Sequence, residues 1–234
     1  MARVAGVDGT PGGWAVVIME ADSWCIRKVC TLSEIVDGPA HLDIVAVDVP
    51  IGLLDAYEVG GRACDRAARK YLSKRASSVF AAPVRPVLAA SSWESACARS
   101  RCSAPHGKAI SKQTFAILPK IREVDELLRT RAELRDVVRE VHPEVCFCEL
   151  KGHPMIYPKG KREGREERQQ ALRQCFHDLD AIVKAGREQG LPLEDILDAA
   201  VACWSALRLV LGKGRSLVQP VPRDMTGLPM TIWV

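Results

Sequence analysis

The start of the chain constrains its fold more than any other part of the sequence. Two apolar stretches, residues 3–8 (RVAGVD) and 14–19 (WAVVIM), are separated only by GTPGG, which is rich in turn-forming residues. So short a connection can join only antiparallel strands. Because residues 24–32 have the composition of a further strand after a short polar break, the sequence predicts an antiparallel three-strand meander.

The rest of the chain alternates between strand and helix patterns. Residues 43–49 (DIVAVDV) are typical of a central strand covered on both faces. We expect strand pairing also in EVCFCEL, within residues 141–150, and extended pieces at 217–221 and 230–234. Helices are predicted over residues 33–38, 63–74, 117–128, 132–139, 172–190 and 194–211. Residues 76–112 show no sustained period and are predicted to be irregular.

These elements predict an α/β fold. Its mixed sheet combines the antiparallel meander with parallel strands and is flanked by helices. We expect a single domain over residues 1–234. The stretch from about 53 to 140 contains no clear strand, and we interpret it as a largely helical and irregular insertion within that domain.

Basic residues are concentrated in two segments, although the whole chain has a net charge of only +4. Residues 61–112 hold eleven Lys and Arg against Asp65 and Glu94, and residues 151–173 hold seven against three acids. Such a concentration is explained by a solvated surface or by a surface for polyanions such as nucleic acid. Charge alone does not decide between them.

Composition also excludes several classes of protein. No apolar run approaches the roughly 18 residues of a membrane span. The first residues reach the acidic Asp8 at once, so we expect no apolar region of a signal peptide there. The nine cysteines include no C-x-x-C pair, which disfavours a structural zinc site and favours reduced thiols in a cytoplasmic protein. The sequence leaves open its protein partners and whether it forms homo-oligomers.

Acidic residues in apolar segments are the candidate functional groups. Asp8 ends the first strand, Asp48 lies at the end of the strand 43–49, and Glu144 opens the predicted strand EVCFCEL. Asp198 lies inside an apolar helix, one turn after Asp195. Because a buried carboxylate is costly unless it is paired, several that converge require a cation, and Mg²⁺ or Mn²⁺ suits oxygen ligands.

Each of these residues also has a simpler explanation. Asp8 and Asp48 are suited to organising turns, Glu144 to a strand edge, and Asp195 to a helix N-terminus. His142 precedes Pro143 and is suited either to orienting Glu144 or to a structural role. A nucleophilic Cys64 beside two arginines is a weaker alternative.

The sequence resembles an uncharacterised bacterial and archaeal family of predicted nucleases with a ribonuclease-H-like fold. The resemblance is carried by VAGVDGTPGGWAVV, VAVDVPIGL, GGRACDRAARKYLSKRASSVFAAPVR, SKQTFAILPKIREVD, EVHPEVCFCELKG, EDILDAAVACWSALR and GLPMTIW, which together span nearly the whole chain. That fold places an aspartate of the first strand beside acids of the fourth strand and the last helix. The usual connection between the fourth and fifth strands is shorter than the roughly ninety residues found here.

The resemblance implies particular roles. Asp8, Asp48, Glu144 and Asp198 are the expected catalytic residues of a metal-dependent nuclease, a hydrolase of phosphodiesters. Asp8, Asp48, Asp198 and Asp195 are the expected ligands of Mg²⁺ or Mn²⁺, held as two ions about 3.5–4 Å apart. Nucleic acid is the expected partner, in salt-sensitive contact with Arg62, Arg66, Arg69, Lys112, Lys120 and His142.

Two other functions fit parts of the sequence. A phosphotransferase related to actin and the sugar kinases would use Asp8-Gly9-Thr10 to hold nucleotide phosphates, but those enzymes usually contain two copies of the fold. A non-catalytic nucleic-acid-binding module would keep the acids for folding alone. The sequence does not distinguish DNA, RNA, a branched junction or a small phosphoester as the substrate.

Overall fold

The computed structural model describes residues 2–21 and 23–234, which form two compact units. The first unit comprises Met1–Asp48, Asp136–Arg215 and Trp233–Val234. The second comprises Val49–Arg135 and Ser216–Ile232. The second unit therefore draws on the C-terminal part of the chain as well as on the stretch predicted as an insertion.

The first unit is built on a five-stranded mixed sheet in the order β3-β2-β1-β4-β5. Its strands are β1 (Arg3–Thr10), β2 (Gly13–Glu20), β3 (Ser23–Val29), β4 (Ile44–Val47) and β5 (Val138–Glu140). The first three strands form the predicted antiparallel meander, whereas β4 is parallel to β1 and β5 is parallel to β4. The α/β class and the mixed sheet are therefore confirmed.

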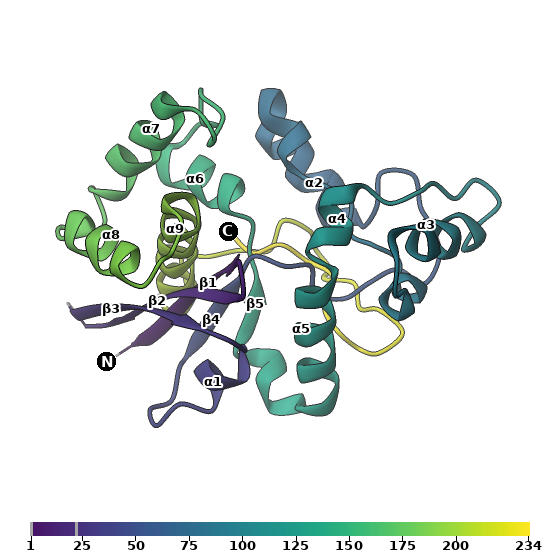
Figure 1. Ribbon diagram of the computed structural model, residues 1–234, viewed down its shortest axis with the longest axis horizontal. Helices are drawn as coiled ribbons and strands as arrows, with labels where there is room; N and C mark the ends of the chain where they lie inside the picture. Colours follow the sequence, from purple (N-terminus) through teal and green to yellow (C-terminus); the bar gives the residue numbers. More distant parts are fainter. Residues whose placement is uncertain (1, 22) are drawn as a thin grey trace. The chain divides into compact units, whose positions relative to one another are not determined.

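Helices cover both faces of this sheet (Figure 1). The long helix α9 (Leu193–Val210) crosses β1, β2 and β4, and α8 (Leu179–Glu188) packs beside it on β3. Helices α6 (Pro143–Lys151) and α7 (Arg162–Leu172) pack on α9, and the short α1 (Ser33–Val36) lies on the other face. The core between α9 and the sheet is apolar, with Val4, Val17, Phe147 and Ala199 among its members.

Helix α9 approaches β1 at Gly6 without an intervening side chain. A Cβ atom at Gly6 would lie 2.0 Å from the amide nitrogen of Cys203 and 2.2 Å from the carbonyl oxygen of Ala199. Real Cβ atoms do not come so close to backbone atoms, so only glycine fits at this position. The contact determines how near the helix lies to the strand.

The prediction of a strand for EVCFCEL is wrong, because these residues form α6. Pro143 lies in the first turn of that helix, and Gly152 ends it in the left-handed conformation. Four consecutive residues, Val145–Cys148, are buried on a helix enclosed by its neighbours, which removes the period of 3.6. The strand lies just before it, as β5, within the stretch predicted to be helical.

Other predictions need smaller corrections. Of the predicted helix 172–190, only Leu179–Glu188 is helical, as α8, and Leu172 is the last residue of α7. The apolar pattern extends beyond α8 because Leu172, Phe176 and Leu179 enter the same core. Residues 217–221 and 230–234 form no regular strand within the described chain, but their backbones pair where the amide of Leu217 donates to the carbonyl of Ile232, at 3.0 Å. An isolated bridge also joins Arg223 to Pro229. The prolines of this region lack the N–H that a longer ladder requires.

The second unit is helical. It contains α2 (Ala63–Leu72), α3 (Trp93–Cys102), α4 (Lys112–Ala116), α5 (Leu118–Thr130) and short 3-10 helices at Ser73–Ser78 and Arg85–Ala89; a further 3-10 helix, Ala132–Asp136, leads to β5. The prediction that residues 76–112 are irregular is therefore wrong for α3. The hydroxyl of Ser92 caps this helix, which has only three buried residues and hence little periodicity.

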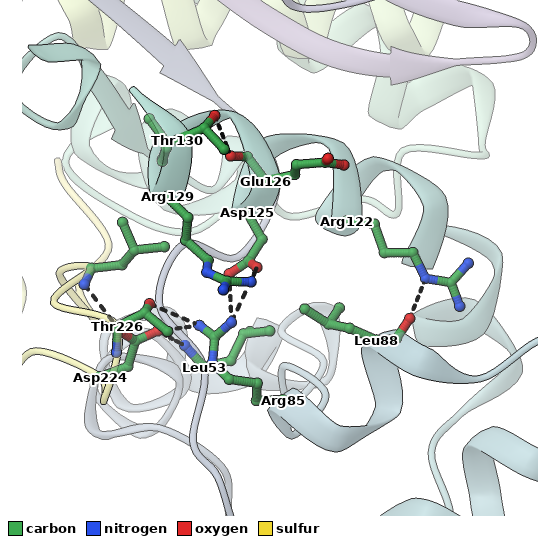
Figure 2. A network of polar contacts seen from close by, with 12 residues as sticks. Leu53, Arg85, Leu88, Arg122, Asp125, Glu126, Arg129, Thr130, Asp224 and Thr226 are labelled. Atoms are coloured by element: carbon green, nitrogen blue, oxygen red, sulfur yellow. Dashed lines mark hydrogen bonds and ion pairs between the residues drawn. The ribbon is translucent and has the colours of Figure 1, made fainter. Parts of the chain in front are cut away.

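A buried polar network holds distant segments of the second unit together (Figure 2). The guanidinium of Arg85 contacts the carboxylates of Asp125, at 2.9 Å, and Asp224. Asp224 also accepts hydrogen bonds from the amides of Leu53, at 2.9 Å, and Thr226, at 2.8 Å. Burial would raise the pKa of Asp224, but these donors outweigh it and lower that pKa.

No helix among the described residues is long and apolar enough to cross a membrane.

Gly6→Ala is expected to lower the free energy of unfolding by about 3 kcal/mol or more, because the methyl group would push the backbones of α9 and β1 apart. Urea denaturation measures the change. Gly160→Ala is the control, since a Cβ atom there meets no atom within 4 Å. It should change stability by less than about 0.5 kcal/mol. Equal effects of the two substitutions would contradict the close packing at Gly6.

Arg85→Met is expected to cost about 3–5 kcal/mol, because it removes the paired cation of the buried Asp224 and leaves Asp125 only the more distant Arg129. Arg129→Met is a matched control. Arg129 also pairs with Asp125, at 3.7 Å, but its side chain is 53% exposed, so its loss should cost less than about 1 kcal/mol. Chemical denaturation of both variants checks the difference.

Candidate functional site

Asp8 and Asp48 lie side by side on the face of the sheet that α9 covers. Gly6 faces α9, and Asp8, two residues further along β1, points the same way. In the parallel pairing Gly6 is opposite Ala46, so the next position on this face of β4 is Asp48. The amide of Asp48 continues the ladder by donating to the carbonyl of Val7, at 3.0 Å. The two carboxyl groups are close enough that each affects the pKa of the other.

Helix α9 supplies a third buried acid opposite this pair. Asp198 directly precedes Ala199, whose carbonyl meets β1 at Gly6, and its side chain is 2% exposed. Asp195, one turn earlier, is partly buried beside the hydroxyl of Thr10. The structure thus brings together Asp8, Asp48, Asp198 and Asp195, which the sequence had singled out.

Like charges and burial together oppose ionisation in this cluster. Burial raises the pKa of Asp8 well above its usual 3.8, and the carboxylates of Asp198 and Asp48 raise it further. Burial also raises the pKa of Asp48, although His142 lowers it in part. The pKa of Asp195 is raised, again chiefly by burial. In such an environment, a carboxyl group is more stable when it is protonated or when a cation lies beside it.

Lys159 supplies a cation to the cluster from the loop between α6 and α7. Its ammonium lies 2.7 Å from Oδ2 of Asp198. The charge of Asp198 is the main reason that the pKa of Lys159 is raised, and Asp8 and Asp48 act in the same direction. Sequence analysis did not single out Lys159, because seven basic residues share its segment and no local pattern distinguishes it.

Glu144, the remaining predicted catalytic acid, forms an ion pair within the first unit. It lies in the first turn of α6, buried, and forms an ion pair with Arg168 of α7. Arg168 is itself buried and donates to the carbonyl of Gly164, at 2.8 Å. The structure therefore gives Glu144 a partner between two helices. His142 directly precedes α6, and its influence on Asp48 places it beside the cluster.

The structure also gives Arg62 a role other than the predicted surface contact. It is 2% exposed and pairs with Asp65, at 2.7 Å. It also donates to the carbonyl of Ile51, at 2.9 Å. Arg62 thus begins α2 as a buried structural residue of the second unit. Cys64, the alternative nucleophile, is completely buried, whereas an accessible thiolate is needed for reaction.

The other predicted phosphate contacts also belong to the second unit. Arg66 is half-exposed and binds the carbonyl of Gly61, while Arg69 binds the carbonyls of Gly60 and Val79. Both arginines therefore stabilise the loop that precedes α2 by binding its backbone carbonyls. Lys112 lies over the ring of Trp93, 5.8 Å from its centre, and Lys120 is partly buried in α5.

The basic segment 151–173 is largely neutralised in the folded chain. Six of its seven cations form ion pairs, namely Lys151 with Glu167, Lys159 with Asp198, Arg162 with Glu166, Arg165 with Glu194, Arg168 with Glu144 and Arg173 with Asp180. Lys161 is exposed and forms no ion pair with a described residue. Most of the positive charge of this segment is therefore balanced by neighbouring carboxylates.

The chemistry of the cluster is that of hard oxygen ligands. Asp8, Asp48 and Asp198 present carboxylates in a buried region, a donor set that suits Mg²⁺ or Mn²⁺. In the described chain these three residues do not offer one oxygen each within 4.8 Å of the other two. The ammonium of Lys159 lies against one of them.

Fold and site together define an α/β protein with a buried cluster of aspartates between a mixed sheet and its longest helix. The chain belongs to the family described as Protein of unknown function (DUF429), which it matches over residues 6–223. Membership of a family without an assigned function is thus confirmed. No curated protein and no solved structure matches the chain. Its function has to be argued from the site.

Asp8→Asn is expected to stabilise the metal-free protein at neutral pH by about 1 kcal/mol, because asparagine resembles the neutral carboxyl group that the site prefers. The pKa of Asp8 is raised on folding, so its destabilising effect begins above pH 3.8 and is complete above the folded pKa. The stability difference between variant and wild type should therefore grow as the pH rises.

Urea denaturation in EDTA at several pH values measures this difference. Glu163→Gln, an exposed change on α7, serves as the control and should leave stability nearly independent of pH relative to wild type. A destabilising effect of Asp8→Asn at neutral pH would contradict the assigned electrostatics.

Proposed function

We propose that this chain is a divalent-metal-dependent phosphodiester hydrolase of the ribonuclease-H-like class, acting on nucleic acid. The observation that carries the proposal is the convergence of Asp8, Asp48 and Asp198 from three elements that are distant in sequence. Burial and mutual repulsion raise the pKa of two of them. A cluster of this kind costs stability, and perturbed carboxyl groups gather at functional sites.

The topology supports the same class. An antiparallel three-strand meander is followed by parallel strands, and a long final helix crosses the first strand. The acids come from the first strand, the end of the fourth strand and that helix, which is the distribution that the ribonuclease-H-like fold implies. Topology by itself indicates only an architecture, so the acids carry the functional part of the proposal.

The carboxylates of Asp8, Asp48 and Asp198 would hold the metal, with Asp195 beside them. When bound, a divalent ion supplies an activated water and stabilises charge on a phosphate. The protein's own residues fix the donors: strand pairing holds Asp8 against Asp48, and the close packing at Gly6 holds Asp198 opposite them. His142 lies beside Asp48 and favours its charged form.

Exposed cations support a nucleic-acid substrate. Within residues 61–112, six basic side chains are exposed and form no ion pair with any described residue: Lys70, Lys74, Arg99, Arg101, Lys108 and Lys112. Contacts between such side chains and a phosphate backbone make binding weaken as salt concentration rises. Since Arg62 is buried and Arg66 and Arg69 bind carbonyls, we assign the phosphate contacts chiefly to the six exposed side chains.

The first test is metal binding. Calorimetric titration of Mn²⁺ should show binding to the wild type and a loss of at least about tenfold in affinity in Asp8→Asn and Asp198→Asn. Glu188→Gln, an exposed acid at the end of α8, should bind as the wild type does. Failure of the wild type to bind Mn²⁺ would remove the metal site and favour a non-catalytic binding module.

The second test is hydrolysis. Labelled single-stranded, duplex and branched DNA and RNA are incubated with Mn²⁺, and cleavage should fall at least about a hundredfold in Asp8→Asn and Asp198→Asn. The circular dichroism of each variant establishes that it is folded. Full activity of both variants on a substrate that the wild type cleaves would overturn the assignment.

A further inference from the structure

Lys159 is held in the cluster by a single hydrogen bond among the described residues. That bond joins its ammonium to Oδ2 of Asp198, while Asp8 and Asp48 act on it through their charge. Its side chain is 52% exposed, whereas that of Asp198 is 2% exposed. One partner is thus fixed in the interior, and the other reaches it from solvent.

The loop that carries Lys159 is anchored before this residue. The carboxylate of Glu167 accepts hydrogen bonds from the amides of Ile156 and Tyr157, at 3.0 and 3.1 Å, and pairs with Lys151, at 2.5 Å. Arg168 donates to the carbonyl of Tyr157, at 3.2 Å. The Lys159 side chain can therefore leave Asp198 without any of these contacts breaking.

A Lys ammonium and a divalent cation need the same thing from this site, the charge of its carboxylates. Lys159 has its ammonium against Asp198, and its flexible four-carbon stem makes the position reversible. Asp198 cannot give the same oxygen to a metal ion at full strength while it accepts a hydrogen bond there. The two cations are therefore competitors.

We propose that Lys159 is the built-in counter-ion of the metal-free site and that a divalent ion binds by displacing it from Asp198. This inference rests on the proposed metal-dependent function and adds a control on it. Bound Lys159 partly balances the charge of the buried carboxylates and lowers the apparent affinity for metal, since only the fraction of molecules with Lys159 released is competent to bind. Lys159 is thus a positioning residue that sets the metal concentration at which the site fills.

The test compares two lysines of the same loop. Mn²⁺ is titrated calorimetrically into wild type, Lys159→Gln and Lys161→Gln, which lose the same charge two residues apart. Lys159→Gln should bind Mn²⁺ about tenfold more tightly than wild type, because competition and charge repulsion are both removed. Lys161→Gln should stay within about twofold of wild type, since distant exposed charges are screened.

Lys159→Arg keeps the charge and should not gain affinity, which separates loss of the counter-ion from loss of packing. A merely structural Lys159 would make Lys159→Gln less stable without tightening Mn²⁺ binding. If Lys159→Gln binds Mn²⁺ as the wild type does or more weakly, the competition is overturned while the proposed function stands. If neither the wild type nor Lys159→Gln binds Mn²⁺, the metal site and this inference fail together.

Discussion

The backbone contact between α9 and β1 at Gly6 determines how the acids of the helix lie against those of the sheet. Asp8 is two residues beyond Gly6 on the same face of the strand, and Asp198 directly precedes the residue whose carbonyl meets it. Close packing of this kind transmits small displacements instead of absorbing them. The helix cannot withdraw from the strand without breaking up the cluster, so the position of the site follows from the core.

The same contact brings like charges together in the interior, which is unfavourable for folding. Selection for stability alone would replace such a group with apolar residues. The interactions that buried carboxylates form in the interior compensate for only a small part of the free energy needed to desolvate them. Here the cost is offset in part by Lys159, with its ammonium 2.7 Å from Asp198. The proposed cation site would explain why the chain keeps these buried carboxylates.

Much of the first unit could be predicted from sequence, because its signals are local. The turn GTPGG and the apolar strands around it fix the hairpin, and the acids stand out since apolar residues surround them. The sequence of α6 predicts a strand because a buried helix has no polar face. Glu144 is a site candidate because it is an acid in an apolar segment, and its partner Arg168 lies 24 residues away, beyond the reach of any local pattern. Lys159 could not be identified, since its role depends on a contact across 39 residues of sequence.

The polar network of the second unit has a consequence for how the chain folds while it is being synthesised. Asp224 bonds to Leu53 and Arg85, which precede it by 171 and 139 residues. Such contacts have a high contact order, and closing loops of this length delays them in folding. During synthesis, the second unit can complete this network only after Asp224 has been made, long after Arg85 and Asp125. In the first unit the hairpin β1–β2 is complete by Glu20, but the helix that packs on it, α9, spans Leu193–Val210. Both units therefore need segments that lie far apart in the sequence before their cores can close.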